Sequence, residues 1–545
     1  MTTKSYLNQA IVSHFIELKA DSDPDREILV FENSGYPEER LTYSEIHEKS
    51  NRIARAFLNA GIGKGDVYAV FMRNHAEFVL SMLAGPVIGA VMVPVDPRSR
   101  GDRLRFLLTH SKASAVVVSA DFLPWLEQVL PQTPLIKTVF VVKKPWQPMP
   151  ESLDWPTLNE ILENDSWESV PQAVMDVRHP MQIIYTSGTT GDPKGVMIRN
   201  NRFGMFTIVT RLVWKYRPSD ILYTGLSLTH GNAQAVTLFP ALATGIPAVI
   251  SAKFTKTRIW DICRKYGCTT FSLLGGMMAG IFNEPFQDND ADNSVKVVVS
   301  AGTPLAIWKD FEKRFDLKIL EWYGAVEGGF AFKPPGKGPV GSFGKPLPGM
   351  MEFRVVDNDD RSVQPGTPGE LIIKMIKGET RVDYLGNTEA SREKTRGGWL
   401  RTGDMIVQDE NGWFFFKSRI GSELRRSGDF IQPDRIERII GEHPDVSEVC
   451  VYGIEAASGA PGESDLVAAV TPFKNRTIDP ALIFEKCRKE LEPNCVPSFL
   501  QIMDKIPKTI SEKALDRVLK QMFSPEADNV FSLTDYQFSF TKEPQ

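Results

Sequence analysis

The stretch Tyr185-Thr-Ser-Gly-Thr-Thr-Gly-Asp-Pro-Lys-Gly-Val-Met197 follows an apolar run that contains Ile183 and Ile184. An apolar run that leads into a polar, Gly-rich segment predicts a β-strand that ends in a loop. Glycines let the loop turn its backbone N–H groups toward an anion, and hydroxyl groups add further donors. Lys194 adds a compact positive charge suited to a polyphosphate. The sequence therefore predicts an anion-binding loop, made by Thr186, Ser187, Gly188, Thr189, Thr190, Gly191 and Lys194.

This loop differs from the Walker phosphate loop. The Walker motif places a Ser or Thr directly after its lysine, and that hydroxyl binds Mg²⁺. Here Pro193 precedes Lys194 and Gly195 follows it, so the usual metal-binding hydroxyl is missing. A Thr- and Gly-rich surface turn without a ligand is the alternative interpretation of the string.

Length and composition place the chain among ordinary globular proteins with more than one domain. Its 545 residues exceed the number that a single hydrophobic core serves. Of these residues 42% are hydrophobic and 24% are charged, as in ordinary globular proteins. The net charge of −5 argues against a nucleic-acid partner. Five cysteines, an odd number in a long chain, fit a reducing compartment rather than a disulfide framework. With no secretory signal evident at the N-terminus, we expect a cytoplasmic protein.

One uncharged run requires a decision about the membrane. Phe78 to Val95 carries no charged residue, which is just long enough for a span. The run contains Gly85-Pro86, Gly89 and Pro94. We therefore predict a buried helix that ends near Ala84 and then a β-strand, and no membrane span.

Strands alternate with helices over the first part of the chain, which is typical of a parallel α/β sheet. A hydroxyl start, a helical apolar period and a Gly stop predict a helix within residues 41–61. The strands expected after it are 67–71, 90–95 and 115–119, separated by helices at 75–84 and 101–111. A linker rich in Pro and Trp covers roughly 144–180.

The alternation resumes after the loop, and the composition changes toward the C-terminus. Strands at 296–300 and 317–323 end in turns, where ligands of open α/β sheets bind. Short strands with frequent Gly and Pro predict a β-rich subdomain at about 340–420. A compact α+β unit follows, and residues 523–545 are expected to be a tail. The unit's predicted elements are helices near 433–442, 479–492 and 511–522 and strands at 447–453 and 465–472.

The loop and several later segments resemble, in order and spacing, the adenylate-forming superfamily of acyl-CoA synthetases, peptide-synthetase adenylation domains and firefly luciferase. The resemblance extends over about residues 25–522. It implies an α/β fold with a large N-terminal domain of parallel α/β layers plus the β-rich subdomain, residues 1–420. It also implies a small mobile α+β domain, residues 421–522. The implied ligands are ATP, Mg²⁺ and coenzyme A.

One motif of the resemblance concerns the nucleotide and its metal. Trp322-Tyr-Gly-Ala-Val-Glu327 is similar to the family's Tyr-Gly-x-Thr-Glu. This implies that Tyr323 stacks on adenine beside Trp322 and Gly324 and that Glu327 binds Mg²⁺. Val326 replaces the family's Thr and removes one hydroxyl from the phosphate side. Alone, the segment would equally fit a core tyrosine beside a solvated glutamate.

Three further segments extend the same resemblance. Trp399-Leu-Arg-Thr-Gly-Asp404 matches Trp-x-x-Thr-Gly-Asp, which implies that Asp404 accepts hydrogen bonds from both ribose hydroxyls. Ala301-Gly302-Thr303 is similar to the family's turn along adenine. His230 matches a histidine near the acyl pocket and the α-phosphate, although a lone histidine is commonly structural.

The C-terminal motifs resemble the family with two substitutions. Arg419 would meet the phosphates, with Ser418 in place of an Asp and Gly421 as the hinge. Gly428 resembles the glycine that lines the coenzyme A tunnel. Lys513 would stabilise charge as the carboxylate attacks the α-phosphate, although Glu512 replaces the usual Gly. Basic surface turns are the alternative interpretation of these segments.

The acyl substrate is the least determined feature. Gly275, Gly276 and Met277 occupy the stretch that lines the acyl pocket in relatives, beside His230 and Gly324. Glycines that remove side chains and an adaptable methionine predict a roomy apolar pocket. Glycines required for backbone packing are the alternative. The pocket would accept an aromatic, alicyclic or medium-chain carboxylic acid.

The resemblance implies an ATP-dependent carboxylate–CoA ligase, with catalytic roles for Lys513, Lys194 and His230. Three alternatives remain open at this point. They are a carnitine-type CoA ligase, a stand-alone adenylation enzyme that loads a carrier protein, and a nucleotide-binding protein that has lost catalysis. The expected partner is a small-molecule carboxylic acid, and the sequence does not distinguish a monomer from a homodimer.

Overall fold

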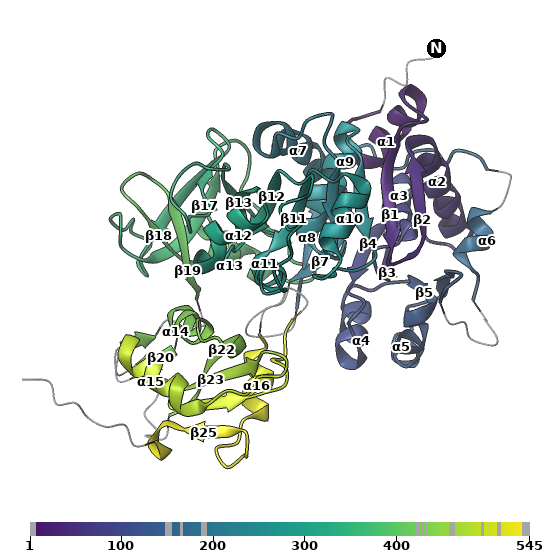
Figure 1. Ribbon diagram of the computed structural model, residues 1–545. Helices are drawn as coiled ribbons and strands as arrows, with labels where there is room; N and C mark the ends of the chain where they lie inside the picture. The colour runs from purple at the N-terminus through teal and green to yellow at the C-terminus, as the bar shows by residue number, and fades with distance from the viewer. Residues whose placement is uncertain are drawn as a thin grey trace, which may run out of the picture. The chain divides into compact units, whose positions relative to one another are not determined.

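The computed structural model describes residues 7–147, 155–163, 167–186, 193–420, 424–426, 429–431, 433–456, 464–491, 495–509 and 514–536. They form two compact units, which are described separately (Figure 1). The first unit falls within Met1–Gly188, Asp192–Phe353 and Ile373–Leu400. The second includes Arg354–Ile372 and Arg401–Gln545. Two segments assigned above to the large domain, 354–372 and 401–420, thus cluster with the second unit, and the boundary at residue 420 stays a prediction.

A six-stranded sheet of the first unit contains the strand that leads into the loop. Its strands lie in the order β6-β5-β3-β4-β7-β8, parallel except for the antiparallel pair β7–β8. The strands are β3 (Val67–Phe71), β4 (Val91–Val95), β5 (Ala115–Ser119), β6 (Thr138–Val142), β7 (Pro180–Thr186) and β8 (Lys194–Arg199). The expected strands at 67–71, 90–95 and 115–119 are therefore confirmed.

Helices between these strands bury their apolar sides. In α2 (Tyr43–Asn59), Thr42 and Glu45 form a capping box, which confirms the predicted helix and its hydroxyl start. Buried residues from β3, β4, β5 and β6 form one core with residues of α4. The other helices along this part of the chain are α1 (Val12–Ser22), α3 (Ala76–Ile88), α4 (Gly101–His110), α5 (Leu123–Glu127) and α6 (Leu158–Leu162).

The predicted end of the third helix was wrong. Helix α3 continues through Gly85 and Pro86 and ends only at Gly89, whose φ of 77° gives a left-handed cap. The Tyr68 hydroxyl donates to the Ser81 carbonyl at 2.6 Å, and a Cβ on Gly85 would fall 2.4 Å from the Tyr68 oxygen. The glycine thus makes room for the tyrosine beside a helix that is buried throughout. The uncharged run is a buried helix followed by strand β4.

The second sheet of the first unit has nine strands. They lie in the order β15-β14-β13-β12-β11-β9-β10-β1-β2, parallel from β13 to β1 and antiparallel toward both edges. The bounds are β1 (Glu27–Asn33), β2 (Tyr36–Thr42), β9 (Leu222–Thr224), β10 (Ala248–Ser251), β11 (Thr270–Leu274), β12 (Val297–Ala301), β13 (Lys318–Ala325), β14 (Gly328–Lys333) and β15 (Lys345–Pro346). The strands expected at 296–300 and 317–323 are confirmed as β12 and β13.

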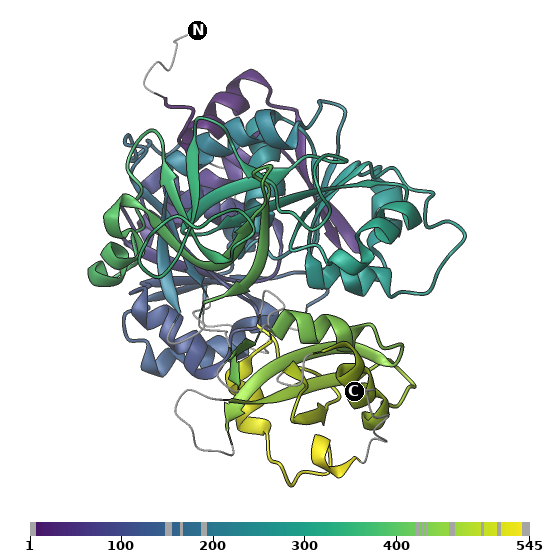
Figure 2. The same cartoon turned by 90° about the vertical axis from the view of Figure 1, so that its left-hand side faces the viewer.

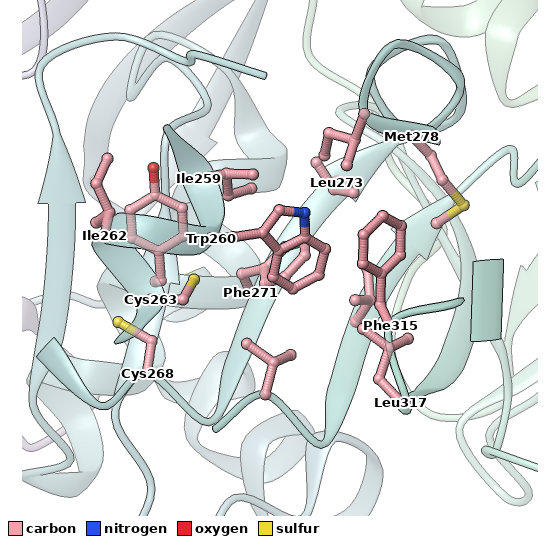
Figure 3. Close-up of a cluster of buried hydrophobic side chains, with 14 of the residues drawn as sticks. Ile259, Trp260, Ile262, Cys263, Cys268, Phe271, Leu273, Met278, Phe315 and Leu317 are labelled. Carbon is pink, nitrogen blue, oxygen red and sulfur yellow. The ribbon is translucent and has the colours of Figure 1, made fainter. Parts of the chain in front are cut away.

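Buried side chains pack on one face of this sheet (Figure 3). Trp260 lies between Phe271 and Phe315, with ring centroids 5.6 and 4.3 Å away. The helices of this half are α7 (Asn201–Val209), α8 (Gly231–Ala233), α9 (Phe239–Thr244), α10 (Ile259–Tyr266), α11 (Gly275–Phe282), α12 (Trp308–Arg314) and α13 (Thr388–Lys394). Two π-helical segments, η3 (Thr210–Trp214) and η4 (Gln234–Leu238), interrupt this pattern. Helices α10, α11 and α12 contribute to the core in Figure 3.

The second unit contains a sheet in the order β22-β23-β24-β25 (Figure 2, green to yellow). Helices α14 and α15 contribute Ile436 and Phe484 to the core on one face, and α16 contributes Leu519 on the other. The bounds are β22 (Val446–Glu455), β23 (Ser464–Pro472), β24 (Phe499–Ile502), β25 (Val530–Ser532), α14 (Pro433–Gly441), α15 (Pro480–Glu490) and α16 (Asp516–Met522). The predicted α+β unit is confirmed.

The remaining strands, β16 to β21, form two smaller sheets. They form a four-stranded sheet, β16-β17-β18-β19, and a two-stranded sheet, β20-β21. The bounds are β16 (Met351–Val356), β17 (Gly369–Met375), β18 (Leu400–Gln408), β19 (Phe414–Arg419), β20 (Leu424–Arg426) and β21 (Asp429–Ile431).

The prediction that a tail begins at residue 523 was wrong for part of that segment. Strand β25 pairs antiparallel with β24, and Val530 is buried. Three residues are too few for an alternating pattern, so the strand is formed by its pairing with β24. In the part of the chain that the structure describes, no helix is both long and apolar enough to cross a membrane.

A buried histidine makes the first unit sensitive to acid. Burial and the charge of Lys144 lower the pKa of His75 to about 4, and neither ring nitrogen has a partner among the described residues. The unfolded chain therefore binds more protons between pH 6.5 and 4, and stability falls as the pH falls through that range. We predict that His75→Leu flattens this loss, measured as melting temperature against pH. Parallel curves for the two proteins would contradict the prediction.

Candidate functional site

The predicted loop lies between two paired strands. Strand β7 ends at Thr186, which pairs with Lys194 at the start of β8. Lys194 is exposed, and Thr186 is partly buried. Ser187, Gly188, Thr189, Thr190 and Gly191 lie outside the described residues. The prediction of a strand that leads into this loop is confirmed, while the loop's binding role stays a prediction.

A distant segment adds to this hairpin. The Met197 N–H donates to the Asp383 carbonyl at 2.9 Å, and the Leu385 N–H donates to the Gly195 carbonyl at 2.8 Å. Asp383 also pairs with Arg199 at 2.5 Å. These bonds fix Tyr384, which is only 7% exposed, beside the start of β8.

Tyr384 joins two of the predicted site residues. Its hydroxyl donates to Glu327 Oε1 at 3.1 Å, and its ring centroid lies 5.2 Å from Lys194 Nζ. Lys194 and Glu327 are thus held on one aromatic side chain. Tyr384 was not predicted as a site residue, because no periodicity or motif marks an isolated tyrosine near residue 384.

Glu327 itself lies between β13 and β14 and is partly buried. Burial lowers the pKa of Arg202 on α7, and the negative charge of Glu327 opposes that effect. Glu327 is therefore close enough to an arginine as well as to Tyr384 to have its charge partly balanced.

A buried glutamate shapes the predicted adenine turn. Glu321 Oε1 accepts the Gly302 N–H at 2.7 Å and the Thr303 N–H at 3.1 Å. The Thr303 hydroxyl donates to the other oxygen of the same carboxyl. Burial raises the pKa of Glu321 to about 7, although these hydrogen bonds oppose the rise. Glu321 thus fixes the turn Ala301-Gly302-Thr303, a role that was not predicted from the sequence.

Gly275 begins α11 directly against this turn. A Cβ on Gly275 would lie 1.9 Å from the Gly302 carbonyl oxygen. Backbone packing therefore accounts for this glycine. Met277 packs against the core in Figure 3. Gly276 lies in the same helix, and the acyl pocket expected from these residues stays a prediction.

Trp322 and Tyr323 lie on opposite faces of β13 because neighbouring strand residues alternate. The Tyr323 ring stacks on Phe343 with centroids 4.7 Å apart. A Cβ on Gly324 would fall 2.7 Å from the Trp322 ring, so Gly324 lets the strand pass close to this indole.

His230 precedes α8 in a segment anchored to β7. The Gln182 amide donates to Gln234 Oε1 at 2.7 Å, and the Gln234 amide donates to the Leu228 carbonyl at 2.8 Å. Burial lowers the pKa of His230, and its Nε2 has no partner among the described residues. Gly231 lies next to Val326, where an added Cβ would be 3.7 Å from the valine methyl carbon.

In the second unit, Asp404 and Arg419 lie directly opposite each other across β18 and β19. Asp404 is 7% exposed, and its N–H donates to Thr402 Oγ1 at 3.0 Å. The Arg419 side chain, Gly428 and Lys513 fall outside the described part of the chain. So do Gly421 and Glu512, and their roles stay predictions.

The sequence matches two family patterns. Residues 16–377 match the AMP-binding enzyme, and residues 435–513 match the AMP-binding enzyme C-terminal domain. The chain belongs to the AMP-binding enzyme family. The predicted relationship to adenylate-forming enzymes is therefore confirmed.

Curated relatives and solved structures agree with this assignment. The crotonobetaine/carnitine–CoA ligase of Salmonella paratyphi B is 28% identical over 506 residues, covering 91% of this chain and 96% of the relative. The anthranilate CoA ligase AuaEII, solved with anthranoyl-AMP, has a TM-score of 0.81 at 20% identity, covering 94% of this chain and 96% of AuaEII. The O-succinylbenzoate CoA synthetase of Bacillus subtilis, solved with ATP and a magnesium ion, has a TM-score of 0.77 at 20% identity, covering 93% and 99%. These likenesses confirm the predicted fold class.

The contact between Gly275 and the Gly302 turn generates a stability prediction. Gly275→Ala should destabilise the first unit by about 1–3 kcal/mol, because the new methyl overlaps a backbone oxygen. Gly280→Ala in the same helix is the matched control, since its Cβ would meet only Lys256 at 3.8 Å. That control should be neutral or stabilising by up to about 1 kcal/mol. Denaturant unfolding measures both, and equal effects would contradict the packing role of Gly275.

Proposed function

We propose that this chain is an ATP-dependent carboxylate–CoA ligase. In the first step a carboxylate oxygen attacks the α-phosphate of ATP, which gives an acyl-adenylate and pyrophosphate. In the second step the thiol of coenzyme A attacks the acyl carbon, which gives the thioester, AMP and a proton. Such chemistry depends on positioning and charge neutralisation rather than on a protein nucleophile.

The observation that carries the proposal is the Lys194–Tyr384–Glu327 arrangement. It places a carboxylate and a cation on one tyrosine at the start of β8, the strand that follows the predicted loop in the chain. A lysine is suited to the transferred phosphates, and a carboxylate oxygen is a ligand that Mg²⁺ prefers. Lys194 would therefore bind the β- and γ-phosphates.

Glu327 fits a Mg²⁺ ion by its donor chemistry. One of its carboxylate oxygens accepts from Tyr384, and the carboxylate is only partly buried. Bound Mg²⁺ would neutralise phosphate charge and orient the leaving pyrophosphate. Val326 contributes no oxygen, so Glu327 is the metal ligand that we propose from this segment.

Adenine would lie along the Gly302 turn against Tyr323, and Asp404 would bind the ribose. The rigid support of the turn by Glu321 favours this placement, because its carboxyl accepts the Gly302 and Thr303 N–H groups and the Thr303 hydroxyl. Lys513 and Arg419 would act on the α-phosphate side, and Gly428 would line the path of coenzyme A. His230 would act near the acyl group.

A carnitine-type acid is the second candidate for the substrate. It is favoured by the 28% identity to crotonobetaine/carnitine–CoA ligases. The main candidate is an aromatic, alicyclic or medium-chain acid. The cytoplasmic location inferred from cysteine usage stays a prediction.

A pyrophosphate-release assay tests the proposed function. The panel contains aromatic, alicyclic, medium-chain and carnitine-type acids, each with and without coenzyme A. We expect acid-dependent pyrophosphate release and a thioester product. Adenylation without a thioester would favour an enzyme that loads a carrier protein. No turnover and no ATP binding with any acid would favour a nucleotide-binding protein without catalysis.

The Tyr384 hydroxyl generates the first kinetic prediction. Tyr384→Phe keeps the ring beside Lys194 but removes the hydrogen bond that orients Glu327. We expect the apparent Mg²⁺ affinity to fall about tenfold, since a hydrogen bond to a charged group is worth about 1.5–3 kcal/mol. The measurement is the adenylation rate against Mg²⁺ concentration.

Tyr266→Phe is the matched control. The Tyr266 hydroxyl also donates to a glutamate, Glu38, at 2.6 Å, on a different part of the first unit. Its loss should leave the Mg²⁺ dependence unchanged. A Tyr384→Phe enzyme with the same Mg²⁺ dependence as the control would contradict the positioning role.

Lys513 generates the second kinetic prediction. Lys513→Ala should abolish adenylation but leave thioester formation from supplied acyl-adenylate largely intact, because the lysine would stabilise charge only in the first step. The two half-reactions are measured separately. Equal losses in both would contradict the proposed division of labour.

A further inference from the structure

An aromatic cluster lies on the face of β12, β13 and β14 opposite the core in Figure 3. Trp322 and Phe330 project from the strands, and Trp214 covers them from η3. The Trp214 ring stands nearly perpendicular to both, with centroids 5.8 Å from Trp322 and 5.6 Å from Phe330. Val236 of η4 belongs to the same cluster.

Two side chains of this cluster and two from the segment that leads into η4 carry buried polar atoms without a hydrogen-bond partner among the described residues. They are Trp214 Nε1, Trp322 Nε1, His230 Nε2 and both amide atoms of Asn232. Asn232 lies one helical turn before Val236, so both project from the same side of their segment. A buried donor or acceptor without a partner costs about 1–3 kcal/mol, so each such group calls for an explanation.

Other polar groups near η4 have hydrogen-bond partners. Gln234 exchanges hydrogen bonds with Gln182, and the Tyr216 hydroxyl donates to the Val236 carbonyl at 3.0 Å. The surrounding residues therefore provide hydrogen-bond partners for Gln234 and Tyr216. Two of the unpartnered side chains, His230 and Asn232, flank Gly231, which lies next to Val326, the residue just before Glu327.

The chemistry of these atoms defines a ligand. Both indole N–H groups can only donate, the asparagine amide donates and accepts, and the imidazole can do either. A surface of aromatic faces with an excess of donors suits an apolar molecule that carries an oxygen acceptor. An acid whose body is purely hydrocarbon would leave the donors unpaired.

We infer that Trp214, Trp322 and Asn232 form an acyl-binding surface that selects carboxylic acids with a hydroxyl or carbonyl oxygen on an otherwise apolar body. This inference rests on the proposed ligase function and specifies its substrate class. The surface discriminates because a site built to bond a substrate oxygen rejects the analogue that lacks it.

Matched pairs of acids test the inference. The probes are cyclohexanecarboxylate with its 4-oxo derivative, phenylacetate with 4-hydroxyphenylacetate, and octanoate with 3-hydroxyoctanoate. We expect the oxygenated member of at least one pair to have a kcat/KM about tenfold or more above its plain partner. Binding is followed in parallel by tryptophan fluorescence without ATP, so that the preference is measured even for acids that are not turned over.

Variants assign the preference to the surface. Trp214→Phe and Asn232→Leu should lower kcat/KM, or affinity, for the oxygenated acid about tenfold more than for its plain partner. Trp260→Phe, the same change in the core of Figure 3, is the control and should leave the ratio between the two acids unaltered.

Equal use or binding of both members in all pairs would overturn the inference, as would a preference that survives both variants. Absence of ATP-dependent turnover with detectable, oxygen-selective binding would count against the ligase function alone. Turnover without oxygen selectivity would count against the inference alone.

Discussion

The separation of two opposite charges by one tyrosine is the interaction on which the proposed site depends. Lys194 and Glu327 would neutralise each other if they formed a direct ion pair. Tyr384 instead attracts the ammonium with its ring face and binds the carboxylate with its hydroxyl. Tyr384 thereby holds both charged groups in place without a direct ion pair between them. A cation for phosphates and an oxygen ligand for a metal then remain available at the same place.

The rest of the first unit positions the groups around this arrangement. Parallel strands β11, β12 and β13 end side by side, so their following turns meet at one edge of the sheet. Gly275 allows the start of α11 to approach the Gly302 turn. Glu321 fixes the same turn by accepting hydrogen bonds from its N–H groups. Glu321 is buried, and burial raises its pKa to about 7 although the hydrogen bonds from the turn oppose the rise.

Much of this could be predicted from the sequence, because strand patterns and short motifs are local. The alternation that predicted β3, β4, β12 and β13 depends only on neighbouring residues, and the loop after β7 carries its chemistry in its own composition. Contacts between distant segments could not be predicted in this way. Tyr384 reaches Lys194 only through the pairing of its segment with β8.

Tertiary packing also explains the wrong predictions. Pro86 and Gly85 signal a helix end locally, yet α3 continues because it is buried on all sides and Gly85 makes room for Tyr68. Strand β25 is formed through its partner β24 rather than through a pattern of its own. Glutamate is usually a surface residue, and only the fold brings Glu321 into hydrogen-bond contact with the Gly302 turn.

The proposed role of Glu327, to hold the metal of the nucleotide complex, can be tested directly. Electron paramagnetic resonance can follow Mn²⁺, in place of Mg²⁺, bound to the protein in the presence of ATP. We predict ATP-dependent Mn²⁺ binding that weakens about tenfold or more in Glu327→Gln, since one carboxylate ligand becomes a neutral amide. Equal Mn²⁺ affinity for the wild-type protein and Glu327→Gln would contradict this role.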